Sequence, residues 1–173
     1  MQAQSPYEIF DVVDICDRVV GQETRAEVHR RALLHRAVHV LVFDATGRLY
    51  LQQRSQYKDT CPGLFTASCA GHVDTGESYD AAAVRELGEE LGIPAEAAAR
   101  VSFLFKSGPC ADTGWEFIQV YRLNWEGALR PNPLEISAGL SVSVPEVDAW
   151  LTAEPQVFAP SFHHLWKLFR IDG

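Results

Sequence analysis

The stretch GHVDTGESYDAAAVRELGEELGI, residues 71–93, is the segment from which the fold of this 173-residue chain can be predicted. Its pattern predicts a helix over residues 78–91. Three acidic side chains in this helix are spaced i, i+3 and i+4 and therefore share one face: Glu86, Glu89 and Glu90. Three apolar side chains lie roughly 130° away and predict the buried side of the helix: Val84, Leu87 and Leu91.

The end of this helix is well marked, and its charge is unusual. Gly92 can take the left-handed conformation that ends a helix, Ile93 can make the accompanying apolar contact, and Pro94 stops propagation. The clustered carboxylates repel one another and lie where the helix dipole disfavours anions. A hard divalent cation such as Mg²⁺ or Mn²⁺ would remove this penalty. A solvated acidic helix face is the alternative interpretation.

The same stretch resembles the Nudix box at every position of that motif. The matching residues are Gly71, Glu77, Arg85, Glu86, Leu87, Glu89, Glu90, Gly92 and Ile93. Seven fixed identities at about 7% usage each would coincide by chance on the order of 10⁻⁸ per start position. The resemblance implies an α/β fold, an α/β/α sandwich with a mixed sheet. It also implies a single Nudix domain over residues 1–173 with its box at residues 71–93.

The resemblance also implies roles for particular residues. The Mg²⁺ or Mn²⁺ ligands and catalytic carboxylates would be the three glutamates, with Glu90 central, joined by the backbone carbonyl of Ala70. Arg85 and Glu77 look like a pair that orients the glutamates from behind. Gly71 and Gly76 would allow tight loop conformations around the site.

The chemistry of a diphosphate suggests further candidates. Metal ions neutralise its charge and activate a water for in-line attack, and a carboxylate must accept the proton of that water. A glutamate of the box could do so, and Glu116 and Glu135 are outside candidates. Arg54 and Lys58 could bind phosphate oxygens. The alternative for Glu116 and Glu135 is that they are ordinary surface glutamates, and the alternative for Arg54 and Lys58 is a solvated strand end.

The rest of the chain predicts a mixture of strands and helices. Two short strands flank a polar turn near Asp17, and a helical piece follows at residues 26–34. A hairpin joins residues 36–43 to residues 48–54. Further strands are expected at residues 64–69, 103–106 and 116–123, and short helices are expected to begin near Pro145 and Pro160.

Composition narrows the functional classes. A formal net charge of −8 argues against binding to nucleic acid or to an anionic membrane surface, whereas a small phosphorylated substrate stays compatible through a bound metal. The four cysteines fit no zinc pattern, and no signal peptide or membrane span is evident. We therefore expect a cytoplasmic protein with reduced thiols, as a monomer or homodimer.

Residues 35–77 also resemble type I isopentenyl diphosphate isomerase and its hydrolase-like relatives, and a weaker likeness runs from about residue 10 to residue 170. Isomerisation is therefore an alternative activity. The isomerase has a catalytic cysteine where this chain has Ala70, and Cys69, one residue earlier, would face the other way on a strand. Its shielding tryptophan aligns nearest to Gln156. The intact box and the missing thiol favour hydrolysis.

One further feature of the isomerase concerns its histidine and glutamate metal ligands. His35, His72 and Glu116 fall at matching positions, and His29 lies about one residue off register. The alternative is that these histidines are structural. A third functional class also stays open, namely a nucleotide-binding Nudix module without turnover, although such modules commonly lose a box glutamate.

Overall fold

The computed structural model describes residues 5–172. In chain order the elements are β1 (Ile9–Val13), β2 (Val19–Thr24), α1 (Arg25–Arg31), β3 (His35–Phe43), β4 (Leu49–Arg54), β5 (Phe65–Thr66), β6 (Cys69–His72), α2 (Tyr79–Leu91), α3 (Ala95–Ala98), β7 (Ser102–Ser107), β8 (Glu116–Asn124), β9 (Ile136–Val142), α4 (Val144–Ala153), the 3₁₀ helix η1 (Pro155–Val157) and α5 (Pro160–Asp172). No helix within this described part is long and apolar enough to cross a membrane.

A seven-stranded mixed sheet forms the centre of the molecule. Its main path is β5-β4-β3-β8-β7, with β6 added to β3 and β9 added to β4. Among the strand pairs of residues 5–172, β3 and β8 alone pair in parallel, in a register that places His35 opposite Glu116. Nearly all residues of β3 are buried, because this strand lies in the middle of the sheet and is covered on both faces.

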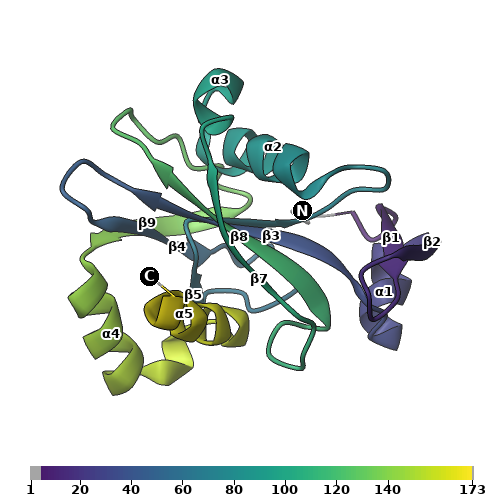
Figure 1. Cartoon of the computed structure of the whole chain (residues 1–173). Coiled ribbons are helices and arrows are strands. Elements are labelled where there is room, and N and C mark those ends of the chain that lie inside the picture. Colours follow the sequence, from purple (N-terminus) through teal and green to yellow (C-terminus); the bar gives the residue numbers. More distant parts are fainter. Residues whose placement is uncertain (1–4, 173) are drawn as a thin grey trace.

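Helices cover both faces of this sheet (Figure 1): α2 and α3 lie on one side, and α4 and α5 on the other. Alternate residues of β3 supply the two cores. Val38, Val40 and Val42 pack with α2, whereas Leu41 and Phe43 pack in the core that contains α5. The predicted α/β/α sandwich with a mixed sheet is therefore confirmed.

The predicted hairpin of β3 and β4 forms only next to its turn. The two strands pair at Phe43 and Leu49 and then separate, because the buried Ser68 hydroxyl lies between them. This hydroxyl accepts a hydrogen bond from the Val42 N–H at 2.8 Å and donates to the Tyr50 carbonyl. β6 then takes the place beside β3, which brings the start of the Nudix-like box into the middle of the sheet.

Other differences from the sequence predictions are local. The strand predicted over residues 64–69 is two short strands, β5 and β6. Helix α1 ends three residues early because Ala32 adopts a left-handed conformation with φ of 50°. The strand β9 and the single-turn helix α3 were not predicted, and β9 has no apolar alternation that would reveal it, because most of its residues are exposed.

Candidate active site

Helix α2 has the start and end that its sequence predicts. The Ser78 hydroxyl accepts a hydrogen bond from the Ala81 N–H at 3.2 Å and caps the first turn. At the other end Gly92 has φ of 66°, and the Ile93 N–H donates to the Leu87 carbonyl at 3.2 Å. Leu87 and Leu91 are fully buried, as predicted, whereas Val84 is only partly buried.

Gly71 provides the space that one glutamate of α2 occupies. A Cβ atom at residue 71 would lie 2.0 Å from the carboxyl carbon of Glu86. The backbone of Gly71 is not in the left-handed region, so its importance is close approach and not loop conformation. Gly76, by contrast, has φ of 75° and does meet the conformational expectation.

Glu90 is buried and its carboxylate is fully engaged. Its Oε2 accepts hydrogen bonds from the Gln52 side chain at 2.8 Å and from the Ala70 N–H at 3.2 Å. Its Oε1 lies 3.5 Å from the ammonium of Lys58, which also pairs with Glu135. These partners satisfy both carboxylate oxygens of Glu90 at the edge of β6, as a buried polar group requires.

Lys58 therefore lies in a different environment from the one expected. The sequence suggested a phosphate-binding or solvated lysine, but its side chain is buried between Glu90 and Glu135 as their counter-ion. Glu135 itself lines the same acidic cavity of about 560 Å³ as the three glutamates of α2.

Arg85 connects several residues of this site. It donates to both carboxylate oxygens of Glu77, at 3.0 and 2.8 Å, and to the His72 carbonyl at 2.9 Å. It also contacts Glu86 at 2.7 Å and the exposed Glu89 at 3.3 Å. The three box glutamates thus differ, because Glu86 and Glu90 are enclosed and Glu89 reaches solvent.

The electrostatics of the enclosed pair suit a cation. Burial and repulsion from Glu90 raise the pKa of Glu86 to about 8, although Arg85 opposes this. Without a cation Glu86 therefore carries a proton near neutral pH. A divalent ion that binds there releases this proton, which is the usual coupling between metal binding and deprotonation.

A second group of potential ligands gathers around His72, the last residue of β6. It consists of His29, His35, His72 and Glu116, one from each of α1, β3, β6 and β8, with ligand atoms within 4.8 Å of one another. The sequence suggested His35, His72 and Glu116 as possible ligands and placed His29 about one residue off register. The structure brings all four together. The parallel register of β3 and β8 is what brings His35 and Glu116 together.

His35 has the arrangement expected of a metal ligand. Its Nδ1 lies 2.8 Å from the Leu33 carbonyl, which can only accept, so the ring proton is on Nδ1. The buried Nε2 meets no geometric hydrogen-bond partner among the described residues and lies 3.4 Å from a Glu116 oxygen. A cation between these two atoms would contact both of them.

His72 and Glu116 have complementary charge states. Burial lowers the pKa of His72 to about 3, so its imidazole is neutral at physiological pH. Burial raises the pKa of Glu116, but His35 and His72 outweigh it and hold that pKa well below its usual range. His72 Nδ1 accepts from Arg25 at 3.0 Å, a contact that must open if Nε2 binds a cation.

Two residues that contact His72 of this group carried no signal in the sequence. Phe10 of β1 stacks on the His72 ring with centroids 4.6 Å apart, and Arg25 is tied to Asp59 by two hydrogen bonds of 3.0 Å. Nothing in the local pattern distinguishes them from ordinary core and helix residues. They become recognisable only when β1 and α1 fold against the end of the sheet, as seen in Figure 1.

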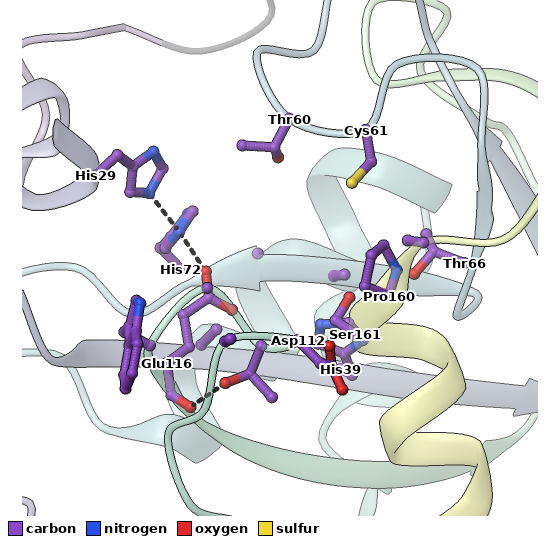
Figure 2. Close-up of a pocket in the computed structure, with 18 of the residues that line it drawn as sticks. His29, His39, Thr60, Cys61, Thr66, His72, Asp112, Glu116, Pro160 and Ser161 are labelled. Carbon is purple, nitrogen blue, oxygen red and sulfur yellow. Dashed lines mark hydrogen bonds and ion pairs between the residues drawn. The ribbon is translucent and has the colours of Figure 1, made fainter. Parts of the chain in front are cut away.

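Three members of the second group, His29, His72 and Glu116, line a pocket of about 450 Å³ (Figure 2). In this view His72 and Glu116 lie on one side, and Thr66, Pro160 and Ser161 on the other. Arg54 also lines the pocket, with its guanidinium held by the Thr60 carbonyl at 2.9 Å. Arg54 and Lys58 are therefore separated, since only Arg54 faces this pocket.

The positions that differ from the isomerase can now be located. Ala70 lines the 450 Å³ pocket, whereas the fully buried Cys69 packs in the core beneath α2. Burial raises the pKa of the Cys69 thiol well above its usual range, so it is not a nucleophile. Gln156 is exposed on η1 and is not among the lining residues, whereas Trp115 is.

His39, which also lines this pocket, makes a pH-dependent contribution to stability. Burial lowers its pKa from 6.5 to about 4. Between pH 6.5 and pH 4 the unfolded chain binds a proton at His39 that the folded protein does not bind. The contribution of His39 to the free energy of unfolding is therefore fully present above pH 6.5 and is lost as the pH falls toward 4. We expect His39→Leu to remove on the order of 2–3 kcal/mol of the difference in unfolding free energy between pH 7.5 and pH 4.5, measured with urea.

The control for this prediction is His163→Gln, because the His163 ring lies on the surface of α5 and bonds to the Pro155 carbonyl. This variant should keep the pH dependence of the unmodified protein. An unchanged pH dependence in His39→Leu would show that His39 does not titrate as described.

A helix that brings enclosed glutamates to β6 of a mixed sheet, with helices on both faces, defines the Nudix class of fold. Comparison with known proteins agrees: a family model described as NUDIX domain matches residues 33–162. The chain therefore belongs to the Nudix family.

Individual relatives show the branch. The chain is 35% identical to an isopentenyl-diphosphate delta-isomerase of Serratia proteamaculans, over 92% of this chain and 90% of that protein. It is 40% identical to an uncharacterised Nudix hydrolase of Streptomyces coelicolor, over 75% of this chain and 71% of that protein. The crystal structure of DR0079 from Deinococcus radiodurans superposes with a TM-score of 0.82 at 29% identity, over 95% of this chain and 99% of that protein. The chain is thus close to isomerase-like Nudix proteins, as its sequence predicted.

Proposed function

We propose that this protein is a Mg²⁺- or Mn²⁺-dependent hydrolase that cleaves the diphosphate linkage of a small X-linked diphosphate. The observation that carries the proposal is the pair of enclosed carboxylates, Glu86 and Glu90, at an acidic cavity. Gly71 leaves room for one, and Gln52 and the Ala70 N–H fix the other. Such oxygen donors match hard divalent cations.

The residues of the acidic cavity would divide the work as follows. Glu86, Glu89 and Glu90, with the Ala70 carbonyl, would hold the metal, which supplies charge neutralisation and an activated water. Arg85, braced by Glu77, positions Glu86. Glu135 lies in this cavity, whereas Glu116 is engaged with histidines and lines the other pocket. Glu135 is therefore the better placed of the two to accept the proton of the attacking water.

The second pocket would hold the group attached to the diphosphate. Arg25 and His72 line both this pocket and the acidic cavity, so a substrate could extend past them from one to the other. Arg54 would then meet the attached group or its far phosphate. The pocket also offers Trp115 as a planar surface, which suits a base or another flat group.

We also propose that the entire chain is one domain. The family match begins at residue 33, yet β1 and α1 precede it and supply Phe10, Arg25 and His29 to the histidine group. Removing the first 32 residues would therefore remove part of the site.

Isomerisation is the second candidate, and a specific observation favours it. The group of His29, His35, His72 and Glu116 has the donor set of a cation site, and the buried Nε2 of His35 faces Glu116 without a hydrogen-bond partner among the described residues. Imidazole and carboxylate ligands suit Mn²⁺ or Zn²⁺. Against it stands Ala70, because the residue that β6 presents to the pocket carries no thiol for a proton-transfer step. The thiol that does line the pocket, that of Cys61, comes from the loop before β5.

The test is a screen of the purified protein with Mg²⁺ or Mn²⁺ against nucleotides, nucleotide sugars, dinucleoside polyphosphates and isoprenoid diphosphates. We expect metal-dependent release of phosphate or of a monophosphate from at least one group, and loss of activity when the metal is chelated. Formation of an isomerised isoprenoid diphosphate without cleavage would establish the second candidate. Binding of a nucleotide without turnover would indicate a non-catalytic module.

A further inference from the structure

A separate group of metal-ligating side chains joins the loop between β7 and β8 to helix α5. Its members are Cys110 and Asp112 of the loop and His164 of the helix, and their ligand atoms all lie within 4.8 Å of one another. Figure 1 shows this loop passing beside α5 on the face of the sheet opposite α2. The group shares no residue with the α2 glutamates or with the histidine group.

We propose that Cys110, Asp112 and His164 form a binding site for a single zinc ion. A thiolate, an imidazole and a carboxylate are the donor types that zinc combines, whereas Mg²⁺ seeks oxygen alone. A tetrahedral ion with bonds of about 2.0–2.3 Å holds its ligand atoms roughly 3.3–3.8 Å apart. Small side-chain rotations reach this spacing from the observed separations of at most 4.8 Å.

The histidine of this site is oriented by a buried hydroxyl. Ser107 is 3% exposed, and its Oγ lies 2.9 Å from His164 Nε2 and 3.1 Å from the Gly108 carbonyl. The carbonyl can only accept, so the single hydroxyl proton goes to it, and the hydroxyl accepts from the Nε2–H of His164. The other ring nitrogen is then left with a lone pair, an arrangement typical of a metal-binding histidine.

The cysteine of this site is held in place by its own loop. The Cys110 N–H donates to the Thr113 hydroxyl at 2.9 Å, and the Trp115 N–H donates to the Cys110 carbonyl at 2.9 Å. Its thiol is free and partly buried. When zinc binds, the S–H bond gives way to a zinc–sulfur bond, and the proton leaves to solvent.

Such a site would fasten one wall of the substrate pocket. Asp112, Trp115 and Glu116 belong to the pocket lining, and so does Ser161 at the start of α5. A zinc ion between Cys110 and His164 would join these two segments. With three protein ligands, the fourth position of the ion is left for water.

The experiment uses Co²⁺ as a spectroscopic substitute for zinc, added to the metal-free full-length protein. We expect a near-ultraviolet sulfur-to-cobalt absorption that saturates at one ion and is abolished by adding Zn²⁺. Cys69 contacts Glu90, and Cys61 lines the pocket that contains His29, His72 and Glu116, so the band is assigned to Cys110 by substitution. Zinc should also raise the melting temperature of the unmodified protein.

Matched variants assign the band. Cys110→Ser should eliminate it, and His164→Gln should weaken zinc binding by about 100-fold, since even partners behind a ligand contribute roughly 10- to 100-fold. Cys16→Ser and His163→Gln are the controls, and each should leave the sulfur-to-cobalt band and the zinc affinity unchanged. Asp112→Asn changes an exposed side chain, so the loop should keep its fold, and this variant should also bind zinc more weakly than the unmodified protein.

The absence of a sulfur-to-cobalt band in the unmodified protein would overturn the proposal. So would a band that survives in Cys110→Ser. Because these readouts do not involve turnover, they are independent of the outcome of the phosphate-release screen.

Discussion

Glu90→Gln is expected to lower metal-dependent hydrolysis by at least about 1000-fold, because it removes the central anionic ligand from the metal. Glutamine has the shape of glutamate, and its carbonyl oxygen can still accept from the Gln52 side chain and the Ala70 N–H. Lys58 keeps Glu135 as its partner. The fold should therefore persist, which circular dichroism and thermal unfolding will check.

The matched control is Glu96→Gln, on the exposed surface of α3 in the segment that follows the box. It changes the net charge by the same amount and should leave the rate within about two-fold, since surface charges away from a site contribute little. Calorimetric titration with Mn²⁺ should show weaker binding only in Glu90→Gln. A rate within ten-fold of the unmodified enzyme in that variant would exclude α2 as the metal-binding helix.

Gly71→Ala is expected to reduce activity by about 100-fold or more, because misplacing a catalytic group by about 1 Å can have that effect. The new methyl group would lie 2.0 Å from the Glu86 carboxyl carbon, so this carboxyl must move. It is the end of a flexible side chain, and the backbone of Gly71 is not in the left-handed region. Stability should therefore change by no more than about 1 kcal/mol.

Two variants distinguish this explanation from general damage. Gly88→Ala, in the helix that carries Glu86, introduces a methyl group at an ordinary distance of 3.7 Å from the Ile93 carbonyl oxygen, and activity should be retained. Adding Glu86→Asp to Gly71→Ala shortens the displaced side chain and should recover part of the lost rate. Equal activity of Gly71→Ala and the unmodified enzyme would show that the position of Glu86 is unimportant.

Much of the chemistry at α2 could be predicted without a structure, because it depends on neighbours within one or two turns. The spacing of Glu86, Glu89 and Glu90 requires only the period of a helix, and Gly92 requires only a left-handed end. Even so, the exposure of Glu89 and the enclosure of Glu90 could not be predicted. They depend on which strand packs beside the helix.

The charged residues after β4 show the limit of local reasoning most clearly. Arg54 and Lys58 lie four residues apart and looked alike as phosphate-binding cations. In the folded protein Arg54 faces the pocket, whereas Lys58 neutralises Glu90 and Glu135. Their separation depends on Glu135, which lies 77 residues further along the chain.

The sequence by itself determined the family, the helix that carries the carboxylates, the central strands and the absence of a thiol at residue 70, because each follows from short-range periodicity or from one residue's identity. The resemblance to the isomerase suggested His35, His72 and Glu116 as a possible ligand set, but only the tertiary structure decided that they meet His29, and that Cys110 and Asp112 meet His164. The physical reason is that strand register and the packing of helices on a sheet arise from contacts between distant segments, which no local pattern encodes.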